Sequence, residues 1–574
     1  MKKTLLFLLL LLASNTLLFS QDFVTIWRTN IPGESISIPT AGAALGYNYD
    51  IDWEDDGVFD NFNIAGDISH NYPIAGLHRV RIRGTFPRIF FNNSGDKDKI
   101  FAVRNWGNQI WTSMRGAFHG CTNLQIIAND SPNLSNVTDM RKMFMDATSF
   151  NSNISSWDTS NIISMAHTFR GASSFNESLN KWDVSHVEDM SYMFCNASSF
   201  NKNLTNWDTS SVMNMSFMFF NAQNFNQEIN NWSTSNVATM QNMFFNASSF
   251  NQDLGTWKTS SVTNMLGMFN NATAFNQNIG KWDVSNVANM ANMFSNASSF
   301  NQKINSWNTA IVSNMSSMFS GATSFNQEIN NWNTSNVLNM SAMFFEATSF
   351  NQDISNWNTS TVTTMRKMFV RASSFNQDIS SWDTNNVISM EHMFNGATSF
   401  DYSIGNWDVS NVTNMSNMFN NVKLSTSNYD NMLQLWDVQS LQEGVYFNGG
   451  NSKYCEGKTA RNNMIASNNW TIADGGSEGL NCTISDFGIA LRNIGNKEVN
   501  GFKLHPNPAH DILFIEGLEK GNHIEVIDVT GKVMMISTTE SAINGINIST
   551  LGSGIYFIKS PTNDSFLIKK LIKI

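Results

Sequence analysis

The amino-acid sequence predicts an α/β repeat solenoid, in which each 25-residue coil contributes a short strand and a short helical segment, with a β-sandwich domain on either side. Two observations predict this fold class. Residues before 100 and after 500 alternate between apolar and polar side chains in short segments bounded by turn residues, as strands do. Between them, tryptophan recurs every 25 residues without an insertion or deletion. These residues are Trp157, Trp182, Trp207, Trp232, Trp257, Trp282, Trp307, Trp332, Trp357, Trp382 and Trp407.

The composition limits the classes of partner. The chain has 574 residues, of which 41% are hydrophobic and only 14% are charged, and its formal net charge is -11. Phosphate binding requires clustered Lys and Arg, and no such cluster is present. We therefore expect no nucleic-acid partner and no binding to an anionic membrane surface.

The first 20 residues are predicted to be a signal peptide. Lys2 and Lys3 precede an apolar run from Leu5 to Leu12, and small and polar residues lead to a cleavage site after Ser20. The apolar run is too short to span a bilayer, and no other segment is a candidate for a membrane span. We expect an exported chain without a membrane-spanning segment, and we expect it to be a monomer.

Residues 21–99 predict an N-terminal β domain, and their segment from Asp50 to Gly57 resembles the corresponding turn of PKD-type β-sandwiches, although the usual Asp-Trp-Gly-Asp-Gly order is altered. Asp52, Glu54 and Asp56 also match part of a calcium-loop spacing. The closing Glu of that signature is missing, because Asn63 stands there. A solvated acidic turn is therefore favoured over a metal site, and calcium binding is left open.

Each repeat has two halves. The first, from Ile154 to Thr159, places large or β-branched residues at its first, fourth and sixth positions, the spacing of a strand in leucine-rich repeats. The second half predicts a short helix, because its apolar residues recur at i, i+3, i+4, i+7 and i+10. In one repeat they are Met240, Met243, Phe244, Ala247 and Phe250. We assign residues 100–422 to this array with a degenerate first coil as its cap, and residues 423–482 to the C-terminal cap.

An Asn column follows the second Phe of each repeat, and two interpretations of it are possible. The side chains can satisfy backbone groups of the turns, or they can form a row of ligand groups. The structural interpretation is favoured because the column lies beside a core Phe. Its members are Asn151, Asn176, Asn201, Asn226, Asn251, Asn276, Asn301, Asn326, Asn351 and Asn376, with Asp401 at the end.

The repeat motif is specific enough to indicate a family. The segment from Trp407 to Phe419 resembles the repeats of BspA-like leucine-rich surface proteins, which are also known from mycoplasma lipoproteins, and the resemblance covers roughly residues 105–450. It implies an extracellular solenoid that is often linked to adhesion or host binding, and it names no ligand.

Residues 483–500 are predicted to be a linker, and residues 501–574 a small β-sandwich. Their alternating segments, beginning at Leu504 and closing with Leu567 to Ile574, resemble the type A C-terminal sorting domain of the type IX secretion system of Bacteroidetes. This resemblance implies that the type IX machinery is a partner, and that the protein is released or attached to the outer surface of the cell.

The cysteines fall into two groups. Cys455 and Cys482 lie close in sequence after the array, and export permits disulfides, so we predict that these two pair. Cys121 and Cys195 fall in different repeats and are expected to be small apolar fillers.

A search for chemistry finds no catalytic motif and no motif for a cofactor or a metal. The nine histidines form no HExxH pair, and no nucleophile elbow, P-loop or dinucleotide-binding fingerprint is present. We therefore expect a protein that is not an enzyme.

The remaining candidate is a binding face formed by the residues that flank each Trp. They are short and polar and lack the bulky aromatic anchors that usually dominate protein interfaces, so a glycan or a repetitive polymer is a reasonable ligand, with matrix and protein ligands left open. A purely solubilising role explains these residues equally well. The candidates are Asn206, Asp208, Asn231, Asp283, Asn331, Asn333, Asn356, Asn358, Asn406 and Asp408. The predicted function is a secreted surface-binding or adhesion protein; the alternatives are a structural spacer or a secreted hydrolase that carries the array as an accessory.

Overall fold

The computed structural model describes residues 21–479, 502–518, 520–528, 532–539, 543–561 and 566–573. The predicted signal peptide and the predicted linker lie outside the described residues. The chain divides into two units, Met1–Glu478 and Gly479–Ile574.

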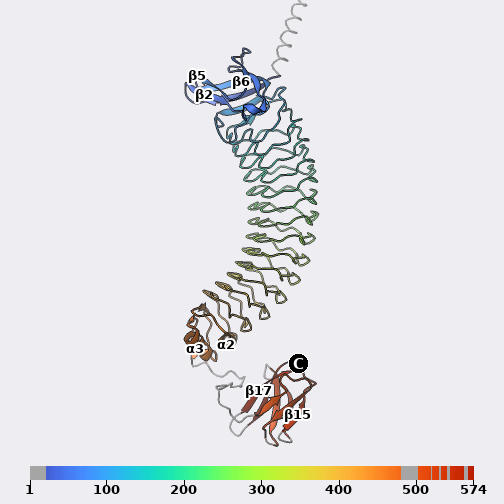
Figure 1. Ribbon diagram of the computed structural model, residues 1–574, viewed down its shortest axis with the longest axis vertical. Helices are drawn as coiled ribbons and strands as arrows, with labels where there is room; N and C mark the ends of the chain where they lie inside the picture. The colour runs from blue at the N-terminus through green and yellow to red at the C-terminus, as the bar shows by residue number, and fades with distance from the viewer. Residues whose placement is uncertain are drawn as a thin grey trace, which may run out of the picture. The chain divides into compact units, whose positions relative to one another are not determined.

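The first unit begins with two sheets whose strands pair mostly in the antiparallel direction (Figure 1). The larger has the order β4-β3-β6-β1-β7-β8, and the smaller pairs β2 with β5. The strands are β1 (Phe23–Thr29), β2 (Glu34–Ile38), β3 (Asn48–Asp52), β4 (Asn61–Ile64), β5 (Ile68–Tyr72), β6 (Gly76–Thr85), β7 (Ile100–Asn105) and β8 (Gln125–Ile126), with a 3-10 turn, η1 (Ala43–Leu45), between β2 and β3. Because β7 pairs with β8 in parallel, the sheet continues directly into the first coil of the array.

The predicted fold class, an α/β repeat solenoid with a strand and a helical segment in every coil, is wrong. The described residues contain two α-helices, α2 (Thr426–Asp437) and α3 (Lys458–Asn468), and both follow the last repeat. Each 25-residue repeat consists of consecutive turns. Parallel pairing between neighbours is limited to one residue per repeat, from Asp139 with Ser164 to Ser389 with Asn414. The segment from Ile154 to Thr159 is not a strand either.

Hydrogen bonding explains why the helical spacing does not produce a helix. Met243 and Ala247 donate their N–H groups three residues back, to the carbonyls of Met240 and Phe244. Asn242 and Asn246, in contrast, have φ of 52° and 55° and donate to carbonyls of the next repeat. A left-handed residue ends an α-helix. Successive turns of three residues bury the same i, i+3, i+4 and i+7 positions that a helix would bury.

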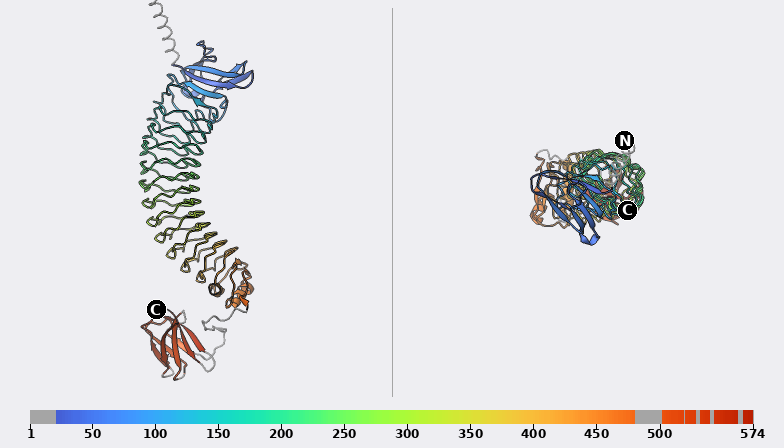
Figure 2. Two further views of the ribbon diagram at one scale, coloured as in Figure 1. Left: turned by 180° about the vertical axis from the view of Figure 1, so that it is seen from behind. Right: turned by 90° about the horizontal axis from the view of Figure 1, so that it is seen from above.

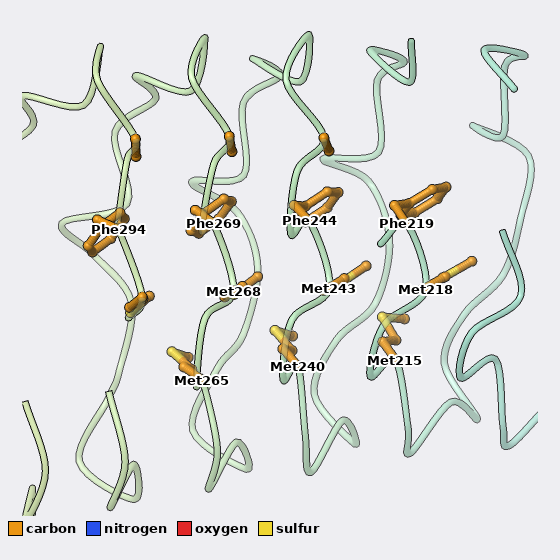
Figure 3. Close-up of a cluster of buried hydrophobic side chains, with 14 of the residues drawn as sticks. Met215, Met218, Phe219, Met240, Met243, Phe244, Met265, Met268, Phe269 and Phe294 are labelled. Carbon is orange, nitrogen blue, oxygen red and sulfur yellow. The ribbon is translucent and has the colours of Figure 1, made fainter. Parts of the chain in front are cut away.

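The interior of the array is a continuous stack of apolar side chains. Figure 3 shows Met and Phe side chains occupying the same place in successive coils. Neighbouring rings of one Phe column are nearly parallel, as in Phe244 and Phe269 with centroids 5.6 Å apart and 5° between planes. The indole Nε1 of Trp282 donates to the carbonyl of Leu254 at 3.0 Å, so each such Trp ties its coil to the preceding one. The coils follow one another through the first unit in the two side views, Figure 1 and the left part of Figure 2.

The array is closed by α2, α3 and the short parallel pair β9 (Tyr446–Asn448) and β10 (Thr471–Ala473). Met415 pairs with Phe447, so the cap continues the parallel pairing of the repeats. Trp436 of α2 is fully buried and packs against Phe447 with centroids 5.4 Å apart. These apolar contacts cover the last coil, whose open face would otherwise meet water.

The second unit contains two sheets, with the orders β11-β12-β15 and β14-β13-β16-β17. Buried side chains of both sheets, including Leu513, Ile515, Val526 and Ile558, form one core. The strands are β11 (Lys503–His505), β12 (Ile512–Glu516), β13 (His523–Asp528), β14 (Val533–Thr538), β15 (Ile543–Asn547), β16 (Gly554–Pro561) and β17 (Phe566–Lys573).

Candidate functional site

The ten residues proposed from the sequence as a ligand face are all exposed, and each lies directly before or after a buried Trp. In most repeats, the second residue after Trp is a buried Thr. Thr259, for example, donates its hydroxyl to the carbonyl of Asp283 in the following coil at 2.8 Å. The chain around Trp is therefore held from inside, with its flanking side chains outside. Whether these side chains bind a ligand stays a prediction.

The residue after Trp caps its own turn. Asp208, Asp283, Asn333, Asn358 and Asp408 each accept, through Oδ1, the backbone N–H two residues later at 2.9–3.0 Å. Hydrogen bonds from the hydroxyl and backbone N–H of Ser285 lower the pKa of Asp283. This arrangement leaves one carboxylate oxygen or amide group of each residue for a ligand.

The residue before Trp also makes contacts within the array. The Nδ2 group of Asn231 donates to the carbonyl of Thr205 at 2.5 Å. The backbone N–H groups of Asn206 and Asn331 donate to side-chain oxygens of Asn180 and Asn305. The polarity of this face is thus partly used to join coils.

The Asn column beside the core Phe is structural, as predicted. Asn276 Oδ1 accepts the backbone N–H of Asn301 and the Nε2 group of Gln302, each at 2.9 Å. The same backbone contact continues to Asp401, which donates its N–H to Asn376 Oδ1 at 3.0 Å. Each Asn therefore supplies a hydrogen-bond acceptor to the next coil.

Two further columns were missed by the sequence reasoning. Each repeat contains two residues with φ between about 50° and 75°, four positions apart. The second is mostly Asn or Gly, a composition that signals left-handed backbone and could have revealed the turn. Its members are Asp146, Gly171, Asn196, Asn221, Asn246, Asn271, Asn296, Gly321, Glu346, Arg371, Gly396 and Asn421. The first is mixed: Lys142, His167, Tyr192, Phe217, Asn242, Gly267, Asn292, Ser317, Ala342, Lys367, His392 and Asn417.

An aromatic row runs along part of the first left-handed column. It consists of His167, Tyr192, Phe217, Phe220 and Phe245, all half-buried on the outside of four consecutive coils. His167 and Tyr192 stack at 4.5 Å with 8° between planes, and Tyr192 and Phe217 at 4.4 Å with 6°. Phe217 lies 5.6 Å from Phe220, which stacks on Phe245 at 4.5 Å.

Two cations lie at one end of the aromatic row. The Arg170 guanidinium is 5.7 Å from the Tyr192 ring centroid, and Lys142 precedes His167 in the left-handed column. Burial, together with the positive charges of Arg170 and Lys142, lowers the pKa of His167 to about 4. The row is therefore uncharged at neutral pH and has positive charge beside it.

The acidic turn of the N-terminal domain is built around a buried carboxylate. Asp52 is fully buried and accepts the backbone N–H groups of residues 54–57, whereas Asp56 caps Val58 at 2.8 Å. Ligand atoms of Asp52, Glu54 and Asp60 lie within 4.8 Å of one another. Burial raises the pKa of Glu54. Asp52 holds the turn in the manner of a cap, whereas Glu54 and Asp56 are exposed, and calcium binding stays a hypothesis.

Two smaller groups bear on chemistry. Cys455 is disulfide-bonded, whereas Cys121 and Cys195 are buried free thiols; the predicted partner, Cys482, lies outside the described residues. Ser185 Oγ contacts the Asp183 carboxylate at 2.7 Å and the His186 ring at 3.3 Å. In a catalytic triad the carboxylate orients the His. Here the Asp183 carboxylate contacts Ser185 instead of His186, and it caps the same turn that Asp or Asn caps in other repeats.

The family model described as "Mycoplasma protein of unknown function, DUF285" matches residues 112–225, 201–301, 277–369 and 352–454. Together these segments span more than half of the chain. The protein belongs to this family. The predicted mycoplasma-type repeats are thereby confirmed, and the assignment to BspA-like leucine-rich proteins is not. No curated protein matches the sequence.

A second family model, described as "Secretion system C-terminal sorting domain", matches residues 503–574. This confirms the predicted type IX sorting domain and makes the secretion machinery a partner. The DUF285-family protein is therefore secreted and attached to the cell surface. Among the described residues, no helix has the length and apolar character needed to cross a bilayer.

Proposed function

We propose that the protein is a non-enzymatic binding protein of the cell surface, whose repeats contact an extracellular glycan, matrix component or protein. The observation that supports this proposal most is the uniform stacking of the repeats. Apolar columns occupy the inside, so the remaining columns are carried outward at a fixed spacing over many coils. Repeat proteins use such extended rows of side chains as binding surfaces.

A structural spacer is the second candidate, and the Trp-flanking face favours it. The Asx caps and the contacts of Asn231 already use some of the hydrogen-bonding groups that a ligand would need. A spacer requires only that the coils be joined strongly, which the Asn column and the Trp indoles accomplish. The two candidates differ in whether a saturable ligand exists.

The test is binding of the whole secreted protein to immobilised glycans and extracellular matrix proteins, followed by surface plasmon resonance. Saturable binding to at least one of them is expected. A variant with Ala at four Trp-flanking positions tests whether the ligand binds this face; the replaced residues are Asn331, Asn333, Asn356 and Asn358. Loss of binding would show that the ligand contacts the Trp-flanking face, and unchanged binding would show that it does not. Absence of saturable binding to every immobilised molecule would favour the spacer and overturn the proposal.

A further inference from the structure

The aromatic row occupies backbone positions that disfavour its side chains. His167, Tyr192 and Phe217 have φ of 57–60°, a conformation that costs an L-residue with a bulky side chain about 1–2 kcal/mol. Other repeats place Asn242, Gly267 or Asn292 there, so the turn itself does not require a ring. Strain that the local fold does not demand is a reason to look for another role.

The stacking determines which part of each ring is available. Tyr192 is covered on both faces, by His167 at 4.5 Å and by Phe217 at 4.4 Å with interplanar angles of 6–8°, so its ring edge is the part left for a partner. Sugars stack on ring faces, so this arrangement disfavours a glycan. Ring edges are the electropositive part of the quadrupole, and they favour carboxylates and aliphatic groups.

The charges nearest the row are mostly positive, since Lys142 and Arg170 act on His167 together with one carboxylate, Asp189. Lys142 and Arg170 have no ion pair among the residues that the structure describes. Of the nearby carboxylates, Asp139 contacts Arg141 at 2.7 Å, Asp146 lies 3.4 Å from the His119 ring, and Asp189 accepts the backbone N–H of Ser191 at 2.9 Å. Lys142 and Arg170 thus bring two positive charges to one end of the row, in a chain whose net charge is -11.

We propose that the aromatic row, together with Lys142 and Arg170, is a docking surface for a segment of a partner protein that carries acidic and aliphatic side chains. The proposal rests on the proposed function and replaces its unspecified ligand by a protein segment. Aromatic residues and Arg are the residue types that dominate protein interfaces. Carboxylates of the partner meet Lys142, Arg170 and the ring edges, and its aliphatic groups cover Phe217, Phe220 and Phe245.

The chain supplies its own replacement residues for a test. Phe217→Asn introduces the residue type that other repeats have at the equivalent positions, Asn242 and Asn292. Phe220→Asn and Phe245→Asn likewise introduce the residue type of the equivalent Asn270. A triple variant of these three should therefore fold. Its matched control is Phe345→Asn, since Phe345 occupies the column of Phe220, is also half-buried, and has Ser320 and Val370 as column neighbours. Equal circular dichroism spectra and melting curves establish that both variants are folded.

The probe is a fluorescent peptide of about ten residues in which Glu and Leu alternate, long enough when extended to cross the coils of the row. We expect fluorescence anisotropy to show saturable binding to the whole protein, at least about tenfold weaker for the triple variant and unchanged for Phe345→Asn. Lys142→Gln with Arg170→Gln should weaken binding and reduce its dependence on salt. A peptide with Lys in place of Glu should bind at least about tenfold more weakly.

Equal binding by the triple variant, equal binding of the Lys peptide, or no binding of the Glu peptide would overturn the docking surface. Competition by a neutral oligosaccharide would assign the row to a glycan and overturn it also. The proposed function is tested independently of this surface. If the triple variant binds an immobilised matrix component as tightly as the unmodified protein does, the protein is still a binding protein, but the aromatic row is not its docking surface.

Discussion

The inside and the outside of the repeats obey different rules. Inside, the coils carry the same Trp, Met and Phe columns with few exceptions such as Thr168, and neighbouring Phe rings stack. The half-buried Asn column beside them joins each coil to the next. Outside, the first left-handed column holds Lys, His, Tyr, Phe, Asn, Gly, Ser and Ala with the same backbone conformation. The difference shows that stacking of the coils restricts the residue type only at positions whose side chains contact the neighbouring coil. Variation along an outer column is therefore where a specific surface can arise.

The largest expected effect comes from a core column. Trp282→Ala removes a buried ring and its hydrogen bond to the Leu254 carbonyl, so the free energy of unfolding should fall by about 3–5 kcal/mol. Urea titration of the secreted protein, followed by far-UV circular dichroism, measures it. Trp282→Phe keeps most of the ring and is the control. A loss below about 1 kcal/mol for the Ala variant would contradict the uniform inner stack.

The Asn column should come next. Asn276→Ala leaves the backbone N–H of Asn301 and the Nε2 group of Gln302 without their acceptor, and should cost about 1–3 kcal/mol. Asp283→Ala, which removes an exposed turn cap, is the matched outer substitution and should cost less. The same urea titration compares the two. If Asp283→Ala proved the more damaging, the distinction between inner and outer columns would be lost.

His167 should make stability depend on pH. Its pKa is lowered from 6.5 to about 4, so the unfolded chain binds the proton more readily, and stability falls as pH drops from about 6.5 to about 4. Because the side chain is half exposed, we expect a loss of about 1–2 kcal/mol over that window. His167→Phe should retain the stack on Tyr192 and remove this component. Melting temperatures of both proteins at several pH values test it, and identical pH profiles would show that His167 does not contribute.

The smallest effect on stability is expected at the aromatic row. Phe217→Asn loses stacking worth about 0.5–1.5 kcal/mol and relieves left-handed strain of about 1–2 kcal/mol. The two terms nearly cancel, so the free energy of unfolding should change by less than about 1 kcal/mol. Urea titration of this variant beside Asn242→Ala, which lies in the next coil of the column, measures the change. A loss comparable to that of Trp282→Ala would place Phe217 in the core and not on a binding surface.

The sequence by itself determined the 25-residue step, the buried columns and the role of the Asn beside the core Phe, because side chains that repeat at a fixed step meet their equivalents when the coils stack. It also identified the sorting domain, since that segment carries a specific motif. The helix prediction failed at Met240 to Phe250 because three-residue turns and a helix bury the same positions. Only the tertiary structure decided between them.

The deciding groups are backbone carbonyls of the next coil. They accept every second N–H of the turn segment, as between Asn242 and Leu266, and this pairing stabilises left-handed residues that a lone segment would avoid. The same turns place Tyr192, Phe217 and Phe220 in contact on the outside. Tyr192 and Phe217 keep the 25-residue step, but Phe220 joins them from three residues further along its own turn, which that step does not indicate. Hydrophobic periodicity records which side chains are buried, and the sign of φ depends on partners about one repeat away.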